Sequence, residues 1–293
     1  MARPKRRLTA EEREERRRRD RERLEQATRE LLSSEGWKRW LRARATLHSY
    51  SFHNSLLIAS QARGLGFEPT YVAGFKAWLR LNRVVKKGAT ALRILAPVTV
   101  KERNADGEET GERRVFFRTV FVFDISQTEV LAGREPVPLE VPCAPLTGES
   151  HAELIGPLER LAGELGYEVR YRPLSGPDGL CDYRRRRISI DERLAANASV
   201  ATLVHELGHA LLENELADDE RLTKELEELV VEAVAYVSLA GAGLDTGRDS
   251  VPYIASWQGE GALEQLRRAA ELIDGLARRI EQTIDAERTP AAA

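Results

Sequence analysis

The stretch TLVHELGHALL, residues 202–212, carries an H-E-x-x-H motif inside an apolar, helix-forming segment. Positions i and i+4 of a helix lie one turn apart on the same side, so His205 and His209 can bind one metal ion together. Glu206 lies between them and can reach a metal-bound water without being a ligand. Because this spacing is typical of zinc with a glutamate general base, we predict a catalytic zinc site on this helix.

The residues around the motif favour a buried helix. Apolar side chains recur at helical spacing, at Val200, Leu203, Val204, Leu207 and Leu211. Gly208 costs about 1 kcal/mol relative to alanine in a helix interior, which predicts that another segment packs closely behind the metal. The competing interpretation is a buried amphipathic helix with two incidental histidines. The chain has only five histidines, and two of them fall at ligand spacing around a glutamate, which favours the metal site.

A zinc site of this kind needs a third protein ligand, and we predict that Glu232 supplies it. A second helix is predicted over residues 219–240, and it offers Glu225, Glu227, Glu228 and Glu232. Glu232 alone is surrounded by apolar residues, and a carboxylate is costly to bury unless it is paired or binds a metal. The other three lie in a polar stretch and are predicted to be solvated. Two alternatives remain: Glu228, one turn earlier, is the ligand, or Glu232 is buried against an arginine.

Composition indicates a soluble protein with room for two domains. The chain has 293 residues, of which 42% are hydrophobic and 31% are charged. No stretch approaches the length of a membrane span, and the N-terminus lacks the apolar segment of a signal peptide. Two cysteines, Cys143 and Cys181, lie in different segments and form no disulfide framework. We therefore expect a cytoplasmic protein with no membrane partner.

The charge is divided unevenly between the two halves of the chain. Residues 1–145 contain 29 Lys and Arg against 19 Asp and Glu, a net charge of +10. Residues 146–293 contain 16 against 28, a net charge of −12, which leaves −2 for the whole chain. A basic half and an acidic half predict domains with different partners, with nucleic acid the candidate for the basic one. A solvated basic surface is the alternative.

A Pro- and Gly-rich stretch, residues 133–150, is the candidate linker between the halves. It separates a predicted domain over 26–145 from one over 150–288. Residues 1–25 are nearly all charged, and we expect a solvent-exposed helix whose Arg16–Arg19 run either contacts phosphates or is solvated. The first domain is predicted to hold helices up to 63, a short helix near 71–78, a strand over 91–100 interrupted by Pro97, and a strand over 114–124. The second is predicted to hold strands at 167–171 and 187–190 among helices at 151–166, 199–213, 219–240 and 261–286, so both are α+β.

Several motifs, in order along the chain, resemble the N-terminal domain of the ArdC-type antirestriction family. They are NSLLI at 54–58, GFKAW at 74–78, RVVKKG at 83–88 and FVFDISQT at 121–128. The C-terminal half resembles the zincin-type metallopeptidase domain that accompanies it, and is similar to the ImmA/IrrE group of HExxH proteins. EAVAY at 232–236 resembles the segment that supplies the third ligand of that domain.

This resemblance covers about 26–145 and 150–288. It implies an N-terminal domain that binds single-stranded DNA and a C-terminal, zincin-like domain that binds a metal. It further implies an association with mobile elements, such as plasmids, that enter a cell as single strands and must survive restriction.

Sequence-neutral binding of single strands needs a cationic groove and aromatic faces for stacking, worth about 1–3 kcal/mol per base. The candidate cations are Lys76, Arg80, Arg83, Lys86, Lys87 and Arg93. Tyr71, Phe75 and Trp78 lie near them in sequence, and each either stacks on bases or belongs to the core. The basic segment 83–87 is the best candidate for phosphate contact.

Two classes of function follow. The first is a zinc metallopeptidase tethered to DNA, with Glu206 as the general base on a zinc-bound water and an unidentified protein as substrate. An extended peptide could then pair with the strand around 188–190 as an edge strand, unless that strand is a solvated hairpin. The second is a non-catalytic protein that coats single-stranded DNA and keeps the metal site as a scaffold. An ImmA-like protease that cleaves a repressor is a further alternative.

Overall fold

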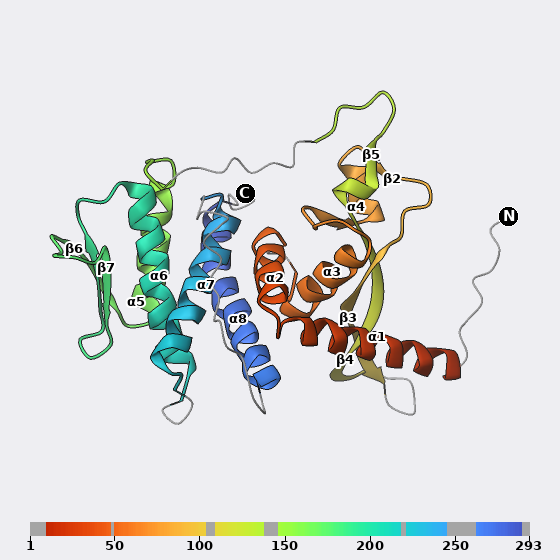
Figure 1. Ribbon diagram of the computed structural model, residues 1–293, viewed down its shortest axis with the longest axis horizontal. Helices are drawn as coiled ribbons and strands as arrows, with labels where there is room; N and C mark the ends of the chain where they lie inside the picture. The colour runs from red at the N-terminus through yellow and green to blue at the C-terminus, as the bar shows by residue number, and fades with distance from the viewer. Residues whose placement is uncertain are drawn as a thin grey trace.

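The computed structural model describes residues 10–47, 50–103, 109–137, 146–217, 221–244 and 262–288. Within these ranges the chain is α+β in both halves, as predicted (Figure 1). Residues 138–145 of the candidate linker and residues 104–108 lie outside them. None of the helices in the described ranges is long and apolar enough to cross a membrane.

Three helices open the N-terminal half: α1 (Ala10–Glu30), α2 (Ser34–Thr46) and α3 (Phe52–Gly64). Ser33 and Ser51 cap α2 and α3, because each side chain accepts a hydrogen bond from a backbone N–H of the first turn. The elements that follow are β1 (Val72–Gly74), α4 (Phe75–Arg80), β2 (Arg83–Val85), β3 (Leu92–Arg103), β4 (Glu109–Asp124), the 3₁₀ helix η1 (Ile125–Gln127) and β5 (Thr128–Val130). The strands form an antiparallel sheet of order β1-β4-β3 and a separate β2-β5 pair.

Helix α3 covers the edge of this sheet with two side-chain amides. The Asn54 side-chain amide donates to the Leu95 carbonyl and accepts a hydrogen bond from the Leu95 N–H, both at 2.9 Å. Gln61 does the same for Arg93, at 2.9 and 3.0 Å. Backbone groups that an edge strand would expose are thereby satisfied.

Strand β3 runs through Pro97 without interruption, so the predicted break is wrong. Successive N–H groups of β3 point alternately toward β4 and away from it, and those of residues 93 and 95 point away. Pro97 lies at the next such position, so its missing N–H removes no hydrogen bond between the strands.

The C-terminal half contains the 3₁₀ helix η2 (Ala152–Leu154), α5 (Ile155–Glu164), β6 (Glu168–Arg172), β7 (Gly179–Asp182), β8 (Arg187–Asp191), α6 (Ala196–Glu215), α7 (Lys224–Ala242) and α8 (Ala262–Arg288). The sheet order is β6-β8-β7, with β8 parallel to β6 and antiparallel to β7. The strand around 188–190 is therefore central, and the prediction that it forms a free edge is wrong. β7 is an edge strand that packs on α6.

The two halves share one hydrophobic core. Helix α8 lies between α7 and the N-terminal helices, and α2 packs on α7 (Figure 1). The buried cluster contains Trp37, Trp40 and Leu41 of α2 together with residues of α5 to α8. A second cluster, between α3 and the β1-β4-β3 sheet, holds Ile58, Ala59, Val72, Leu92, Ile94 and Val122. Helix α7 is therefore packed directly against the N-terminal half.

A buried ion-pair network crosses the same interface. Arg44 of α2 is fully buried, and its Nε lies 2.5 Å from Asp274 Oδ1 of α8. Its two terminal nitrogens donate to the Glu281 carboxylate at 3.0 and 2.9 Å. Asp274 also accepts the Phe52 N–H at the start of α3, at 3.0 Å. Burial on its own would lower the pKa of Arg44, but Glu281 and Asp274 outweigh it and raise that pKa, so the guanidinium is charged and holds α2, α3 and α8 together.

Candidate metal centre

Helix α6 presents the H-E-x-x-H residues along one side of a tightly packed helix. The predicted stripe of Val200, Leu203, Val204 and Leu207 is fully buried. At Gly208, a Cβ would lie only 3.0 Å from Cγ1 of Val231 on α7. The glycine therefore allows α7 to approach α6 closely, as predicted from its position in the motif.

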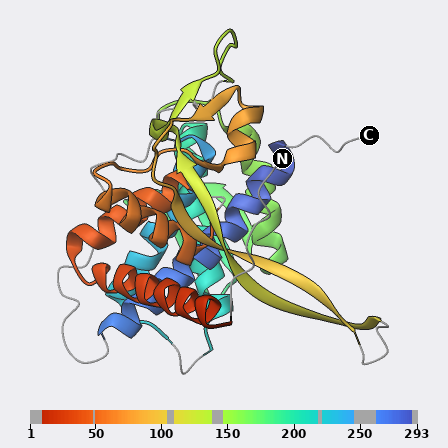
Figure 2. The ribbon, with the colours of Figure 1, turned by 90° about the vertical axis from the view of Figure 1, so that its right-hand side faces the viewer.

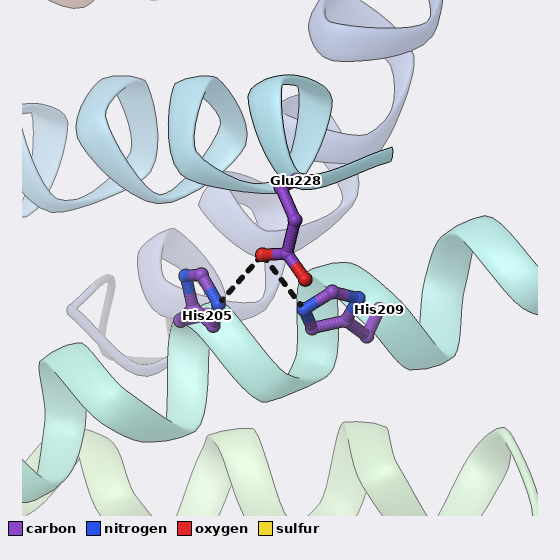
Figure 3. A group of neighbouring side chains, drawn as sticks. All are labelled: His205, His209 and Glu228. Carbon is purple, nitrogen blue, oxygen red and sulfur yellow. Dashed lines mark ion pairs between the residues drawn. The ribbon is translucent and has the colours of Figure 1, made fainter. Parts of the chain in front are cut away.

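His205, His209 and Glu228 lie together, with one ligand atom from each within 4.8 Å of the others. Oε2 of Glu228 is 3.9 Å from Nε2 of His205 and 3.7 Å from Nε2 of His209 (Figure 3). Ligand atoms about 2.0–2.1 Å from a tetrahedral zinc would stand roughly 3.3 Å apart, so a small closure suffices. Two imidazoles and a carboxylate are also a ligand set that zinc accepts. Within the described ranges no other group of His, Cys, Asp and Glu meets the same distance limit.

Glu232 lies one turn further along α7 and is outside this cluster, although it lines the cleft beside His205 and Glu206. Its side chain is largely exposed, while its neighbours Val231 and Ala233 are fully buried. The prediction that apolar neighbours would bury Glu232 is therefore wrong, since they occupy other faces of the helix. Partial burial and the nearby Glu228 still raise the pKa of Glu232, which marks it as a carboxylate in a crowded acidic site.

Glu206 is buried beneath the edge strand β7. A Cβ on Gly179 would lie 2.6 Å from Oε1 of Glu206 and 2.5 Å from Cγ2 of Thr202, so only glycine lets the strand pass so close. Burial and, next, the charge of Glu228 raise the pKa of Glu206 to about 7, against a backbone hydrogen bond from Cys181 that lowers it. A cation at the two histidines would favour the ionised form.

His209 is oriented by a carboxylate and a phenol behind it. Its Nδ1 lies 3.0 Å from Oε1 of Glu227 and 3.0 Å from the Tyr183 hydroxyl. The hydroxyl itself donates to Glu227 at 2.5 Å, and burial followed by Glu227 raises the pKa of Tyr183, which keeps it protonated. A proton on Nδ1 donated to Glu227 leaves the Nε2 lone pair turned toward the metal position. Burial and, next, the neighbouring His209 lower the pKa of His205, which favours the neutral imidazole that binds a cation.

The sequence did not predict that Glu227 and Tyr183 orient His209. Glu227 was predicted to be solvated, but its carboxylate is half-buried against His209. A signal existed, because Glu227 lies one turn before the apolar Val231 and so shares the face of α7 that meets Gly208 of α6. Tyr183 gives no such signal, since it reaches the site from the turn between β7 and β8, 26 residues away from His209 in sequence.

The predicted DNA-contacting cations fall on α4, on β2 with the turn after it, and on β3. Lys76, Arg80 and Lys87 are exposed. Arg83 donates to the Thr128 hydroxyl at 2.8 Å and so joins β2 to β5. Lys86, although exposed, donates to the Ser126 carbonyl at 2.9 Å. The guanidinium of Arg93 lies 6.0 Å from the ring centre of Phe121.

The three aromatic residues predicted near these cations differ in their surroundings. Trp78 is fully buried, and its Nε1 donates to the Phe123 carbonyl at 3.0 Å. It therefore belongs to the core. Tyr71 packs edge-on against Trp78, with ring centres 5.4 Å apart, yet remains partly exposed. Phe75 is exposed.

Two family models match different parts of the chain. Residues 11–123 match the family model for the N-terminal domain of the anti-restriction factor ArdC. Residues 162–241 match the model for the IrrE N-terminal-like domain, of the M78 peptidases. An uncharacterized protein of Bacillus anthracis is 26% identical over 256 residues, which cover 74% of this chain and 42% of that protein. The chain thus spans less than half the length of this curated relative.

Two crystal structures of the antirestriction protein ArdC from plasmid R388 are also similar. The metal-free one is 18% identical with a TM-score of 0.46, over 80% of this chain and 83% of that one. The Mn(II)-bound one is 19% identical with a TM-score of 0.48, over 82% and 85%. The chain therefore combines a domain of the ArdC N-terminal family, over residues 11–123, with an IrrE N-terminal-like domain, over residues 162–241.

Proposed function

We propose that this protein is an antirestriction factor whose N-terminal half binds single-stranded DNA and whose C-terminal half is a zinc metallopeptidase. The observation that carries the enzymatic part is the cluster of His205, His209 and Glu228 with Glu206 beside it in a cleft. The DNA part is supported by the ArdC N-terminal domain and by the net charge of +10 over residues 1–145.

The residues of the cleft divide the chemistry between them. When bound, zinc would polarise a peptide carbonyl and lower the pKa of a water from 15.7 to about 7. Glu206 accepts a proton from the attacking water and passes it to the leaving amine. Glu227 and Tyr183 hold the His209 ring in place. A protein substrate in extended form pairs with the outer edge of β7. The backbone groups of residue 179 and the carbonyl of residue 181 face that edge, because the Asp191 N–H donates to the Asp178 carbonyl on the other side, while the Cys181 N–H is already bonded to Glu206.

The third ligand can be identified by its effect on zinc content. Glu228 is nearer both histidines, so Glu228→Ala is expected to lose most of the bound zinc and Glu232→Ala to retain it. Mass spectrometry of the native proteins measures the zinc-to-protein ratio. The reverse result would assign the third ligand to Glu232, as its place in the EAVAY segment predicts.

The DNA-binding half is tested by removing two exposed cations. Lys86→Ala with Lys87→Ala is expected to weaken binding of a single-stranded oligonucleotide by the full chain and to flatten the dependence of affinity on salt. Each phosphate that the variant no longer neutralises should reduce the log–log slope by about 0.7. Fluorescence anisotropy at several salt concentrations measures both quantities, with a duplex as the competing ligand.

A matched control removes the same charge from the other half, by Arg184→Ala with Arg185→Ala, whose side chains are exposed between β7 and β8. Equal losses of affinity for the oligonucleotide in the two double variants would show that binding depends only on the net charge of the protein. Equal affinity of the unchanged protein for single strands and duplex would reject the single-strand preference.

A further inference from the structure

The outer face of the β3–β4 hairpin carries aromatic side chains that the rest of the protein leaves exposed. Val120 and Val122 of β4 turn toward α3, Val122 within the core of the sheet and Val120 packed against it. Because side chains alternate along a strand, Phe117 and Phe121 turn to the opposite face. Phe117 is 66% exposed and Phe121 is 47% exposed.

The hairpin extends well beyond the helices that cover its base (Figure 2). Large aromatic side chains are normally buried, and these two form a partly exposed apolar stripe on one strand face. Water is a poor solvent for such a stripe, and exposed apolar patches on soluble proteins commonly mark binding sites. The question is therefore which partner has the chemistry to cover it.

A cation lies directly beside the stripe. Arg93 of β3 is the cross-strand partner of Phe121 in the register, and its guanidinium is 6.0 Å from the Phe121 ring centre. Aromatic faces interleaved with cations match a single-stranded nucleic acid, whose bases stack on the rings while its phosphates meet the charges. Protein–protein interfaces are also rich in aromatic residues and Arg, but the net charge of +10 over residues 1–145 favours an anionic partner. A DNA duplex keeps its base faces stacked inside, where no side chain on this sheet can reach them.

We propose that Phe117 and Phe121 are base-stacking residues of a single-strand binding face on β3–β4, with Arg93 meeting the phosphate backbone beside them. This inference rests on the proposed function, in which the N-terminal half binds single-stranded DNA, and it deepens that function by naming the surface. The face lies on the side of the sheet away from α3, so bound DNA leaves the core undisturbed.

The test uses the full chain and a fluorescent oligothymidine. Phe121→Ala is expected to weaken binding about 5- to 100-fold, as loss of one stacked base predicts, and Phe117→Ala with Phe121→Ala to weaken it further. The slope of affinity against salt should stay unchanged, because a stacked ring neutralises no phosphate. This separates the stacking residues from Lys86 and Lys87. Phe121→Trp should retain the affinity, since tryptophan offers a larger stacking face.

Leu65→Ala is the control, because Leu65 is a similarly exposed apolar side chain, at 43%, at the end of α3. It should leave DNA binding as it is. If the unchanged protein binds oligothymidine and Phe121→Ala binds it equally well, the stacking face is rejected while DNA binding stands. If the unchanged protein binds no single strand at all, the proposed function fails first and the stacking face with it.

Discussion

Replacement of Glu206 by glutamine should leave zinc bound and reduce peptide hydrolysis by about 10²- to 10⁴-fold, the usual contribution of a general base. Glutamine has the same shape, and its amide oxygen can still accept the Cys181 N–H that lowers the pKa of Glu206. The cluster of His205, His209 and Glu228 does not include Glu206, so its ligand atoms are untouched. Zinc content by mass spectrometry and hydrolysis of a susceptible protein are measured on the same preparation.

The control is His205→Ala, which should lose both zinc and hydrolysis because it removes a ligand. Wild-type hydrolysis by Glu206→Gln would show that the general base has been misassigned. A different result would change the class of function: no hydrolysis by the unchanged protein, with antirestriction intact in Glu206→Gln, would leave the metal site as a scaffold of a DNA-coating protein. Protection of an incoming plasmid in a restricting host measures that activity.

The parts of the site that were predicted from sequence are the local ones. The motif on α6 places His205, Glu206 and His209 by helical periodicity alone, and Gly208 indicated the close approach of α7. These inferences need only residues within a few positions of one another. The α+β class followed for the same reason, from the alternation of helical and strand patterns along the chain.

What the sequence could not reveal depends on contacts between distant segments. The order β6-β8-β7 makes the strand around 188–190 central, and strand order is not encoded in the pattern of any single strand. Tyr183 meets His209 only because the turn after β7 folds over α6. Phe117 and Phe121 lay in a correctly predicted strand, but the alternation of side chains does not show which face a helix will cover.

The largest expected loss of stability comes from Arg44, whose network no local pattern predicts. Arg44→Ala should reduce the free energy of unfolding by about 3–5 kcal/mol, because it leaves the Glu281 carboxylate buried without its cation and leaves Asp274 with Arg278 alone. Since α2 and α8 belong to one core, both halves should unfold in a single transition in the unchanged protein. Urea denaturation followed by circular dichroism measures the midpoint and the slope.

An ion pair on the same helix supplies the comparison. Arg267 pairs with Glu264 on α8 at 2.6 Å, but both side chains are exposed, so Arg267→Ala should cost less than about 1 kcal/mol. The contrast follows from desolvation: water replaces the missing partner of Glu264, whereas the carboxylates around Arg44 are largely shielded from water. Similar losses in the free energy of unfolding of the two variants would mean that the buried network contributes no more than an exposed ion pair. Two separate transitions in the unchanged protein would mean that the N-terminal and C-terminal halves fold independently despite their shared core.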